Sequence, residues 1–353
     1  MLCCGSCFGY EFLKVHVGVK SSLIGNCNFC PSQGVPLIRP ELLADLFNPV
    51  VDLYRRLDTD GQSLVALLRD DWNMFDEVSD DKACEILRHV FGDPDFIFDC
   101  YEPINEGVDG VLVKWDEFRQ ELQHDNRFFP DSFPNIDELS SLLSYLSVQT
   151  NRELNVLYRA RLNPDSSTQH LIEDMGAPPP ERATAGRANP FGISYLYVAS
   201  TEKTALSELR PHSGDYYTVA DYKLGSGLKL IDLRNPRITV SPFRYSDEEI
   251  KKIHSGIGLL VKLGEELAKP VSQSKAQLEY LSSQYLCEFI KSQGYEGVIY
   301  KSSLGDGDNF AIFDNAHLRG VRTRAFRVTG VEIIHVPHGV EVKPVEEEPE
   351  AIV

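Results

Sequence analysis

The first half of the chain repeats apolar residues mostly with the period of an α-helix. Between Pro40 and about Thr150, leucine, valine and aromatic residues recur three or four positions apart. The spacing is clearest in three segments, 42–57, 80–91 and 114–126. Stretches rich in Asp, Gly and Pro separate these segments, and a further helix is expected over 137–149. The pattern therefore predicts an α-helical domain over residues 39–150.

The second half changes to short apolar runs, which are typical of strands, with helical patterns between them. Strands are expected over 154–162, 195–199, 217–224, 228–233, 297–302, 310–313 and 324–334. Helices are expected over 201–209, 247–268 and 277–292. Thr201 is the expected N-cap of the first of these helices. The fold class is therefore predicted as mixed α+β, with the strand-rich domain over 151–340 and an acidic tail over 341–353.

Composition and charge narrow the classes of function. The chain has 353 residues, of which 42% are hydrophobic and 25% charged, as in an ordinary globular protein of more than one domain. The net charge of -18 repels phosphate backbones, so nucleic acid is disfavoured as a partner. No apolar run is long enough to span a membrane, and no export signal is visible, so we expect a cytoplasmic protein.

Five of the eight cysteines lie in the first thirty residues. Four of them form two C-x2-C pairs, Cys4 with Cys7 and Cys27 with Cys30, and two such pairs complete a tetrahedral zinc site. Four thiolates leave no position for water, so the zinc would be structural. The pattern predicts a zinc ribbon over residues 1–38 with Cys3 as the spare thiol; free or redox-active cysteines are the alternative.

Several polar residues of the second half are candidates for a site that binds an anionic nucleotide. Arginines bind pyrophosphate, aromatic rings stack on bases, and serine or asparagine side chains bind ribose, while a carboxylate stabilises an oxocarbenium-like carbon. The candidates are Arg159, Arg161, Arg187, Tyr197, Glu208, Ser302, Ser303 and Asn309. Periodicity alone leaves open that each of them is an ordinary ion-paired, core or surface residue.

The order of these residues resembles the RES-domain family. The similar segments are Leu157-Tyr-Arg159, Gly186-Arg-Ala-Asn189, Leu196-Tyr-Val-Ala199, Glu202–Glu208, Tyr280–Gln284, Gly294–Ser303 and Asn309–Phe313. The resemblance covers about residues 154–335, and the first half resembles the zinc-ribbon and helical module found ahead of some such domains. Lys301 stands where the family often has proline before its serine, which leaves the choice between Ser302 and Ser303 open.

The resemblance implies an ADP-ribosyltransferase-like β-core with NAD as the substrate, cleaved at the nicotinamide–ribose bond by hydrolysis or phosphorolysis. It assigns Arg159 and Arg187 to the phosphates, Tyr197 to the nicotinamide end and Glu208 to the ribosyl cation. Ser302, or Ser303, would hold ribose or pyrophosphate, with Asn309 beside it. Members of this kind act as toxins or defence effectors of bacterial cells, so a restraining antitoxin or an activating partner is expected, and self-association stays open.

Three other functions remain open at this point. Protein ADP-ribosylation would use the same cleft and differ only in the acceptor. A HEPN-like ribonuclease would use Arg119 and His124, which match an R-x4-H pattern on a predicted helix. A non-enzymatic zinc-ribbon adaptor would carry an inactive second half, although the intact series of Arg, Tyr, Glu and Ser argues against this.

Overall fold

A computed structural model describes most of the chain. The described residues are 1–93, 99–104, 108–133, 135–150, 156–272, 274–314, 316 and 318–332, with the side chains of 108–113 excepted. The acidic tail predicted over 341–353 lies outside them. The domain boundaries at 38, 150 and 340 stay predictions.

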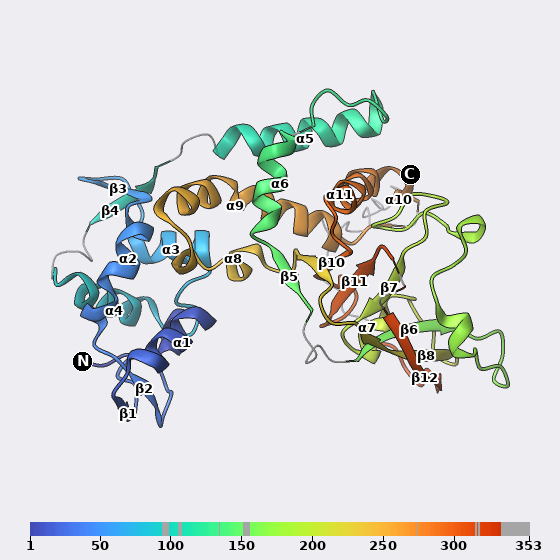
Figure 1. Ribbon diagram of the computed structural model, residues 1–353, viewed down its shortest axis with the longest axis horizontal. Helices are drawn as coiled ribbons and strands as arrows, with labels where there is room; N and C mark the ends of the chain where they lie inside the picture. The colour runs from blue at the N-terminus through green and yellow to red at the C-terminus, as the bar shows by residue number, and fades with distance from the viewer. Residues whose placement is uncertain are drawn as a thin grey trace, which may run out of the picture.

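The N-terminal part is mostly helical, as the sequence predicted (Figure 1). Its helices are η1 (Gly5–Phe8), α1 (Glu11–Lys20), η2 (Pro40–Leu43), α2 (Ala44–Val51), α3 (Leu64–Trp72), α4 (Asp80–Phe91), α5 (Val108–His124) and α6 (Ile136–Ser144). It also contains two small antiparallel strand pairs: β1 (Leu23–Gly25) with β2 (Val35–Leu37), and β3 (Tyr54–Leu57) with β4 (Cys100–Pro103).

The C-terminal part contains an eight-stranded mixed sheet in the order β12-β8-β6-β7-β11-β10-β9-β5. Its strands are β5 (Ser147–Gln149), β6 (Leu157–Leu162), β7 (Leu196–Ala199), β8 (Tyr216–Leu224), β9 (Lys229–Asp232), β10 (Gly297–Lys301), β11 (Asp308–Ile312) and β12 (Leu318–Arg327). Only the β9–β10 pair is parallel among the named pairs. The mixed α+β class is therefore confirmed.

One predicted helix ends earlier than expected. The helix proposed over 137–149 stops at Ser144, and residues 147–149 form the edge strand β5, which pairs antiparallel with β9. Backbone hydrogen bonds at both ends hold this strand, from the Asp232 N–H to Leu146 O at 2.9 Å and from the Thr150 N–H to Leu228 O at 3.0 Å. Pairing with the sheet thus overrides the local helical pattern.

The remaining helices cover the sheet and join it to the N-terminal part. They are α7 (Glu202–Ser207), α8 (Pro236–Thr239), α9 (Asp247–Ala268), α10 (Ala276–Glu279) and α11 (Leu281–Ser292), with the short 3-10 turns η4 (Ile172–Met175), η5 (Pro180–Arg182) and η6 (Pro242–Arg244). A capping box between Ser246 and Glu249 starts α9 at the predicted residue.

Helix α9 lies between the N-terminal helices and the sheet, where it contacts α2, α5, α6, α8, α11 and β10 (Figure 1). Two glycines allow these close contacts. A Cβ at Gly256 would lie 2.4 Å from a Leu142 methyl carbon of α6, and one at Gly264 would lie 2.4 Å from the Leu233 carbonyl oxygen. One buried core includes residues of both parts, from Cys3 to Phe313. A second apolar cluster includes Leu157, Met175 and Ile312.

Candidate active site and cysteine cluster

A cavity of about 880 Å³ opens where β6, β7 and β11 lie beside α7, α10 and the loop at 186–187. Five of the eight predicted residues line it: Arg159, Arg187, Tyr197, Glu208 and Asn309. The polar and aromatic lining residues that the sequence did not assign to the site are Tyr158, Arg210, His212, Tyr280 and Tyr300. Residues far apart in sequence thus meet in one hollow.

Glu208 follows directly after α7 and is held by two hydrogen bonds. The Thr201 hydroxyl accepts from the Thr204 N–H at 3.0 Å, so the predicted N-cap starts this helix. The Ser302 hydroxyl and the Asn309 amide each donate to Glu208 Oε1 at 2.6 Å. Among the described residues none donates to Oε2, so one carboxylate oxygen is fixed and the other is available to a ligand.

The turn at 302–307 positions Ser302 next to Glu208. The Ser302 N–H donates to Gly307 O at 3.1 Å, and the Gly307 N–H donates to the Thr204 hydroxyl of α7 at 3.2 Å. A Cβ at Gly307 would lie 2.5 Å from that hydroxyl oxygen, so only glycine permits the contact. Ser303 makes no hydrogen bond to any described residue. The geometry therefore favours Ser302 over Ser303 as the serine beside Glu208.

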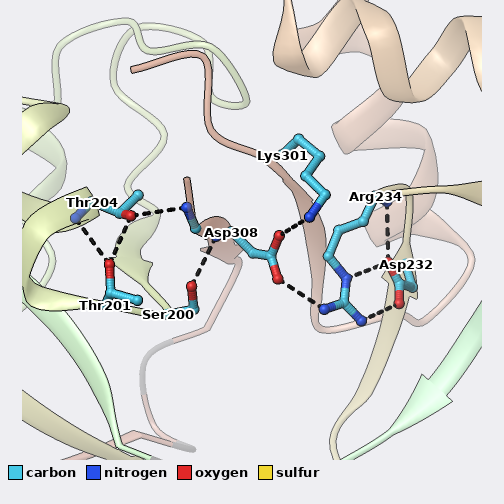
Figure 2. Close-up of polar contacts among 8 residues, drawn as sticks. Ser200, Thr201, Thr204, Asp232, Arg234, Lys301 and Asp308 are labelled. Atoms are coloured by element: carbon cyan, nitrogen blue, oxygen red, sulfur yellow. Dashed lines mark hydrogen bonds and ion pairs between the residues drawn. The ribbon is translucent and has the colours of Figure 1, made fainter. Parts of the chain in front are cut away.

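Asp308 anchors the other end of this turn, as Figure 2 shows. Its two carboxylate oxygens accept from Lys301 Nζ and from Arg234, each at 2.9 Å, and Asp232 holds Arg234 in turn. Burial opposes ionisation of Asp308, but the hydrogen bonds from Lys301 and Arg234 outweigh it and lower the pKa of its carboxyl. The Asp308 N–H also donates to the Ser200 hydroxyl at 2.8 Å, which ties the turn to the residue after β7.

Arg159 extends from β6 beneath the cavity without a carboxylate partner among the described residues. Its guanidinium donates to the Tyr197 carbonyl at 3.1 Å, and its buried Nε has no hydrogen-bond partner. Desolvation lowers the pKa of Arg159, but a guanidinium remains charged at any physiological pH. A partly buried guanidinium without a carboxylate partner is stabilised by an anionic ligand.

Arg187 lies over the Tyr280 ring, with 5.3 Å between the guanidinium carbon and the ring centroid, and donates to the Lys269 carbonyl. Helix α11 fixes the backbone here, because the Ser283 hydroxyl donates to Arg187 O at 2.6 Å and the Gln284 amide donates to Gly186 O at 2.8 Å. The arginine is thus oriented by an aromatic ring and a neutral carbonyl, and its charge is not cancelled.

Tyr197 and Asn189 hold the loop that carries Arg187. The Tyr197 hydroxyl donates to Asn189 Oδ1 at 2.7 Å and accepts from the Ala188 N–H at 3.0 Å. The Asn189 amide nitrogen donates to three carbonyls of the same loop. A Cβ at Gly186 would lie 2.7 Å from the Tyr197 hydroxyl, which explains the glycine. Both hydrogen bonds of the Tyr197 hydroxyl therefore stabilise the loop that carries Arg187.

Arg161 and Arg119 have other partners. Arg161 is exposed and donates to the Asp174 carbonyl at 2.6 Å, away from the cavity lining. Arg119 of α5 forms an ion pair at 3.1 Å with the buried Glu266 of α9. That pair gives Arg119 a structural role between two helices, and His124 at the end of α5 is exposed.

The four cysteines of the two pairs converge as predicted, with all four sulfur atoms within 4.8 Å of one another. Cys4 Sγ lies 3.9 Å from Cys7 Sγ and 3.4 Å from Cys30 Sγ. Tetrahedral zinc with Zn–S bonds of about 2.3 Å requires sulfur separations of about 3.8 Å, so the donor set fits this ion. The buried Cys3 instead lies 3.7 Å from the Ile38 carbonyl oxygen. The cluster could therefore hold a zinc ion without Cys3.

No helix among the described residues combines the length and apolar character needed to cross a bilayer.

No curated protein matches the chain. Among solved structures, it is similar to a chain in the crystal structure of the M.tuberculosis MbcT-MbcA toxin-antitoxin complex, at 12% identity and a TM-score of 0.35, over 54% of this chain and 92% of that one. The sequence model of the RES domain matches residues 141–332, which begin within α6 and end after β12. The chain belongs to the RES-domain family.

Proposed function

We propose that this chain is an NAD-consuming enzyme that cleaves the bond between nicotinamide and ribose in the cavity. The observation that carries the proposal is the carboxylate of Glu208. It is fixed by Ser302 and Asn309 and lines a cavity that is also lined by Arg159 and Arg187, neither of which has a carboxylate partner among the described residues. Family membership supports the same conclusion.

The proposed reaction needs little acid catalysis, because nicotinamide leaves as a neutral ring. The C1′–N bond breaks, its electron pair goes to the nicotinamide nitrogen, and positive charge develops on the ribose carbon. An oxygen nucleophile then forms the new bond to C1′: water releases a proton to solvent, whereas phosphate attacks through an oxygen that carries no proton. Glu208 would stabilise the developing cation, since a fixed carboxylate costs no reorganisation in the transition state.

The size and lining of the cavity suit a dinucleotide. Its volume of about 880 Å³ lies within the range of ligand sites in proteins. Arg159 and Arg187 would bind the pyrophosphate, and the rings of Tyr197 and Tyr280 offer flat surfaces to the nicotinamide and adenine ends. These roles follow the series of residues that the sequence predicted, with Tyr280 added by the geometry.

For the cysteine cluster we propose a structural zinc ion bound by Cys4, Cys7, Cys27 and Cys30. The ion would link the turn at η1 to the hairpin of β1 and β2 and would leave no coordination site for substrate. Cys4 and Cys7 belong to the same buried core as α9, so we expect loss of the ion to destabilise the helices around α9 as well.

An enzyme that depletes NAD must be restrained in the cell that makes it. We therefore propose a restraining or activating partner chain. Coexpression of the active protein with candidate neighbouring genes, followed by purification through this chain, would test whether such a partner binds and inhibits.

The experiment that tests the function incubates the full-length protein with NAD, with and without phosphate, and quantifies nicotinamide over time. Release of nicotinamide with free ADP-ribose supports hydrolysis, and release with ADP-ribose 1-phosphate supports phosphorolysis. NAD labelled on the adenylate separates protein ADP-ribosylation, since the label would then remain on protein. Intact NAD under all these conditions, with and without a copurified partner, would contradict the proposal.

A further inference from the structure

Arg210 lies two residues after Glu208 in an unusual backbone conformation. Its φ is 50°, in the left-handed region, and its N–H donates to the Ser207 carbonyl at 2.9 Å just past the end of α7. Glycine is strongly preferred where a chain leaves a helix in this conformation, because a Cβ is disfavoured there. An arginine at this position therefore lowers local stability, and such strain is typical of residues whose side chain has a function.

The Arg210 and Arg187 side chains are both anchored on the short segment that follows α9. Arg210 Nη2 donates to the Val271 carbonyl at 3.1 Å, and Arg187 donates to the carbonyl of Lys269, two residues earlier. Since consecutive Cα atoms are about 3.8 Å apart, these two anchor residues lie within about 8 Å of each other. Both arginines line the cavity. The short segment after α9 therefore anchors two arginines that line the same cavity.

Neither guanidinium is neutralised by its anchor. A carbonyl oxygen occupies one or two of the five N–H donors of an arginine and leaves the rest available to a ligand. No described carboxylate forms an ion pair with either residue. Two cations that line one cavity with free, forked donors are suited to two linked phosphate groups, each of which accepts two parallel hydrogen bonds.

We infer that Arg210 is a specificity-determining residue that binds the pyrophosphate group together with Arg187. The inference rests on the proposed function, since it assigns the ligand class of the same cavity: a nucleoside diphosphate joined to a sugar. The left-handed turn directs the Arg210 side chain toward the segment after α9, while Glu208, two positions earlier, remains beside Ser302.

The test uses the full-length protein and three variants. Arg210→Gly removes the side chain and supplies the residue that the backbone conformation prefers, whereas Arg210→Lys keeps a charge but loses the fork. Arg182→Gly removes an exposed arginine outside the cavity lining and is the matched control. For each protein the Kd of ADP-ribose is measured by calorimetry, with adenosine as a ligand lacking phosphate. Thermal unfolding and the KM and kcat for NAD are recorded in parallel.

For Arg210→Gly we expect the Kd of ADP-ribose and the KM for NAD to rise about 10- to 100-fold, as for lost charge-assisted hydrogen bonds. The Kd of adenosine should not change, and the Tm should stay equal or rise. Arg210→Lys should be intermediate and Arg182→Gly should match the wild type. An unchanged Kd of ADP-ribose in Arg210→Gly, or an equal loss for adenosine, overturns the inference.

The inference and the proposed function fail in different ways. If the wild type binds ADP-ribose through Arg210 but releases no nicotinamide from NAD, the enzymatic proposal fails and the pyrophosphate site stands. If NAD is cleaved equally well by wild type and Arg210→Gly, the enzyme stands and Arg210 has no such role. Absence of ADP-ribose binding by the wild type rejects the site.

Discussion

Replacing Glu208 by glutamine tests the centre of the proposed mechanism. Glutamine keeps an oxygen that accepts from Ser302 and Asn309, which both donate to Oε1 at 2.6 Å, so the local geometry should survive. The negative charge is lost, and an amide N–H₂ takes the place of Oε2. A carboxylate about 4 Å from a developing cation contributes about 4 kcal/mol at an effective dielectric constant of about 20. That energy corresponds to roughly a thousandfold in rate.

We therefore expect Glu208→Gln to lower kcat for nicotinamide release by about 10²- to 10³-fold, with little change in the Kd of ADP-ribose. The assay follows nicotinamide by chromatography over a range of NAD concentrations. Glu248→Gln, which removes an exposed carboxylate at the start of α9, is the control and should match the wild type. A kcat for Glu208→Gln within about tenfold of the wild type would refute the idea that this carboxylate faces the ribosyl cation.

Three further changes have defined outcomes. Ser302→Ala should lower kcat by about tenfold, the effect of one lost hydrogen bond to a charged group, whereas Ser303→Ala should leave kcat unchanged; equal effects would reject the assignment. Cys27→Ser should abolish binding of a zinc ion, measured by metal analysis of the purified protein, and lower the Tm, whereas Cys3→Ser should retain the metal. The pKa of Asp308 is lowered in the folded protein, so its contribution to stability is present above its unfolded pKa of about 3.9 and is lost as pH falls through the folded pKa. Asp308→Asn should therefore flatten the acid side of a plot of Tm against pH. An unchanged plot would contradict the stabilising role of the contacts of Asp308 with Lys301 and Arg234.

Local signals in the sequence predicted the elements that depend on local chemistry. The N-cap Thr201, the start of α9 after Ser246 and the convergence of the two cysteine pairs all follow from short-range patterns, and all are confirmed. The early end of α6 was not predictable in this way. Residues 147–149 become strand β5 because β9, some eighty positions later, offers an unpaired edge.

The site was predictable only in part, for a related reason. The sequence placed Glu208, Arg159 and Tyr197 among the candidates through the order of a family pattern. Arg210 carries no such signal, since its relevance depends on a positive φ and on where the segment after α9 lies. Tyr280 begins one of the segments that resemble the family, but its contact with Arg187 is visible only in the fold. The type of a residue in a loop does not show which carbonyl oxygen or aromatic ring its side chain will contact in the folded protein.

The acceptors of the arginines explain how a chain with a net charge of -18 can offer a site to an anion. Arg234 and Arg324 are paired with carboxylates, which cancel their charges and make them structural cross-links. Arg159, Arg187 and Arg210 donate instead to the carbonyls of Tyr197, Lys269 and Val271. A neutral carbonyl fixes the direction of a guanidinium without neutralising it, so the positive potential of these three groups remains focused in the cavity despite the acidic surface. A substitution that places a carboxylate within ion-pairing distance of one of these three arginines should therefore raise the Kd of ADP-ribose while changing the Tm little. The new ion pair would neutralise the guanidinium, as the carboxylates beside Arg234 and Arg324 do, and leave it unable to attract an anion.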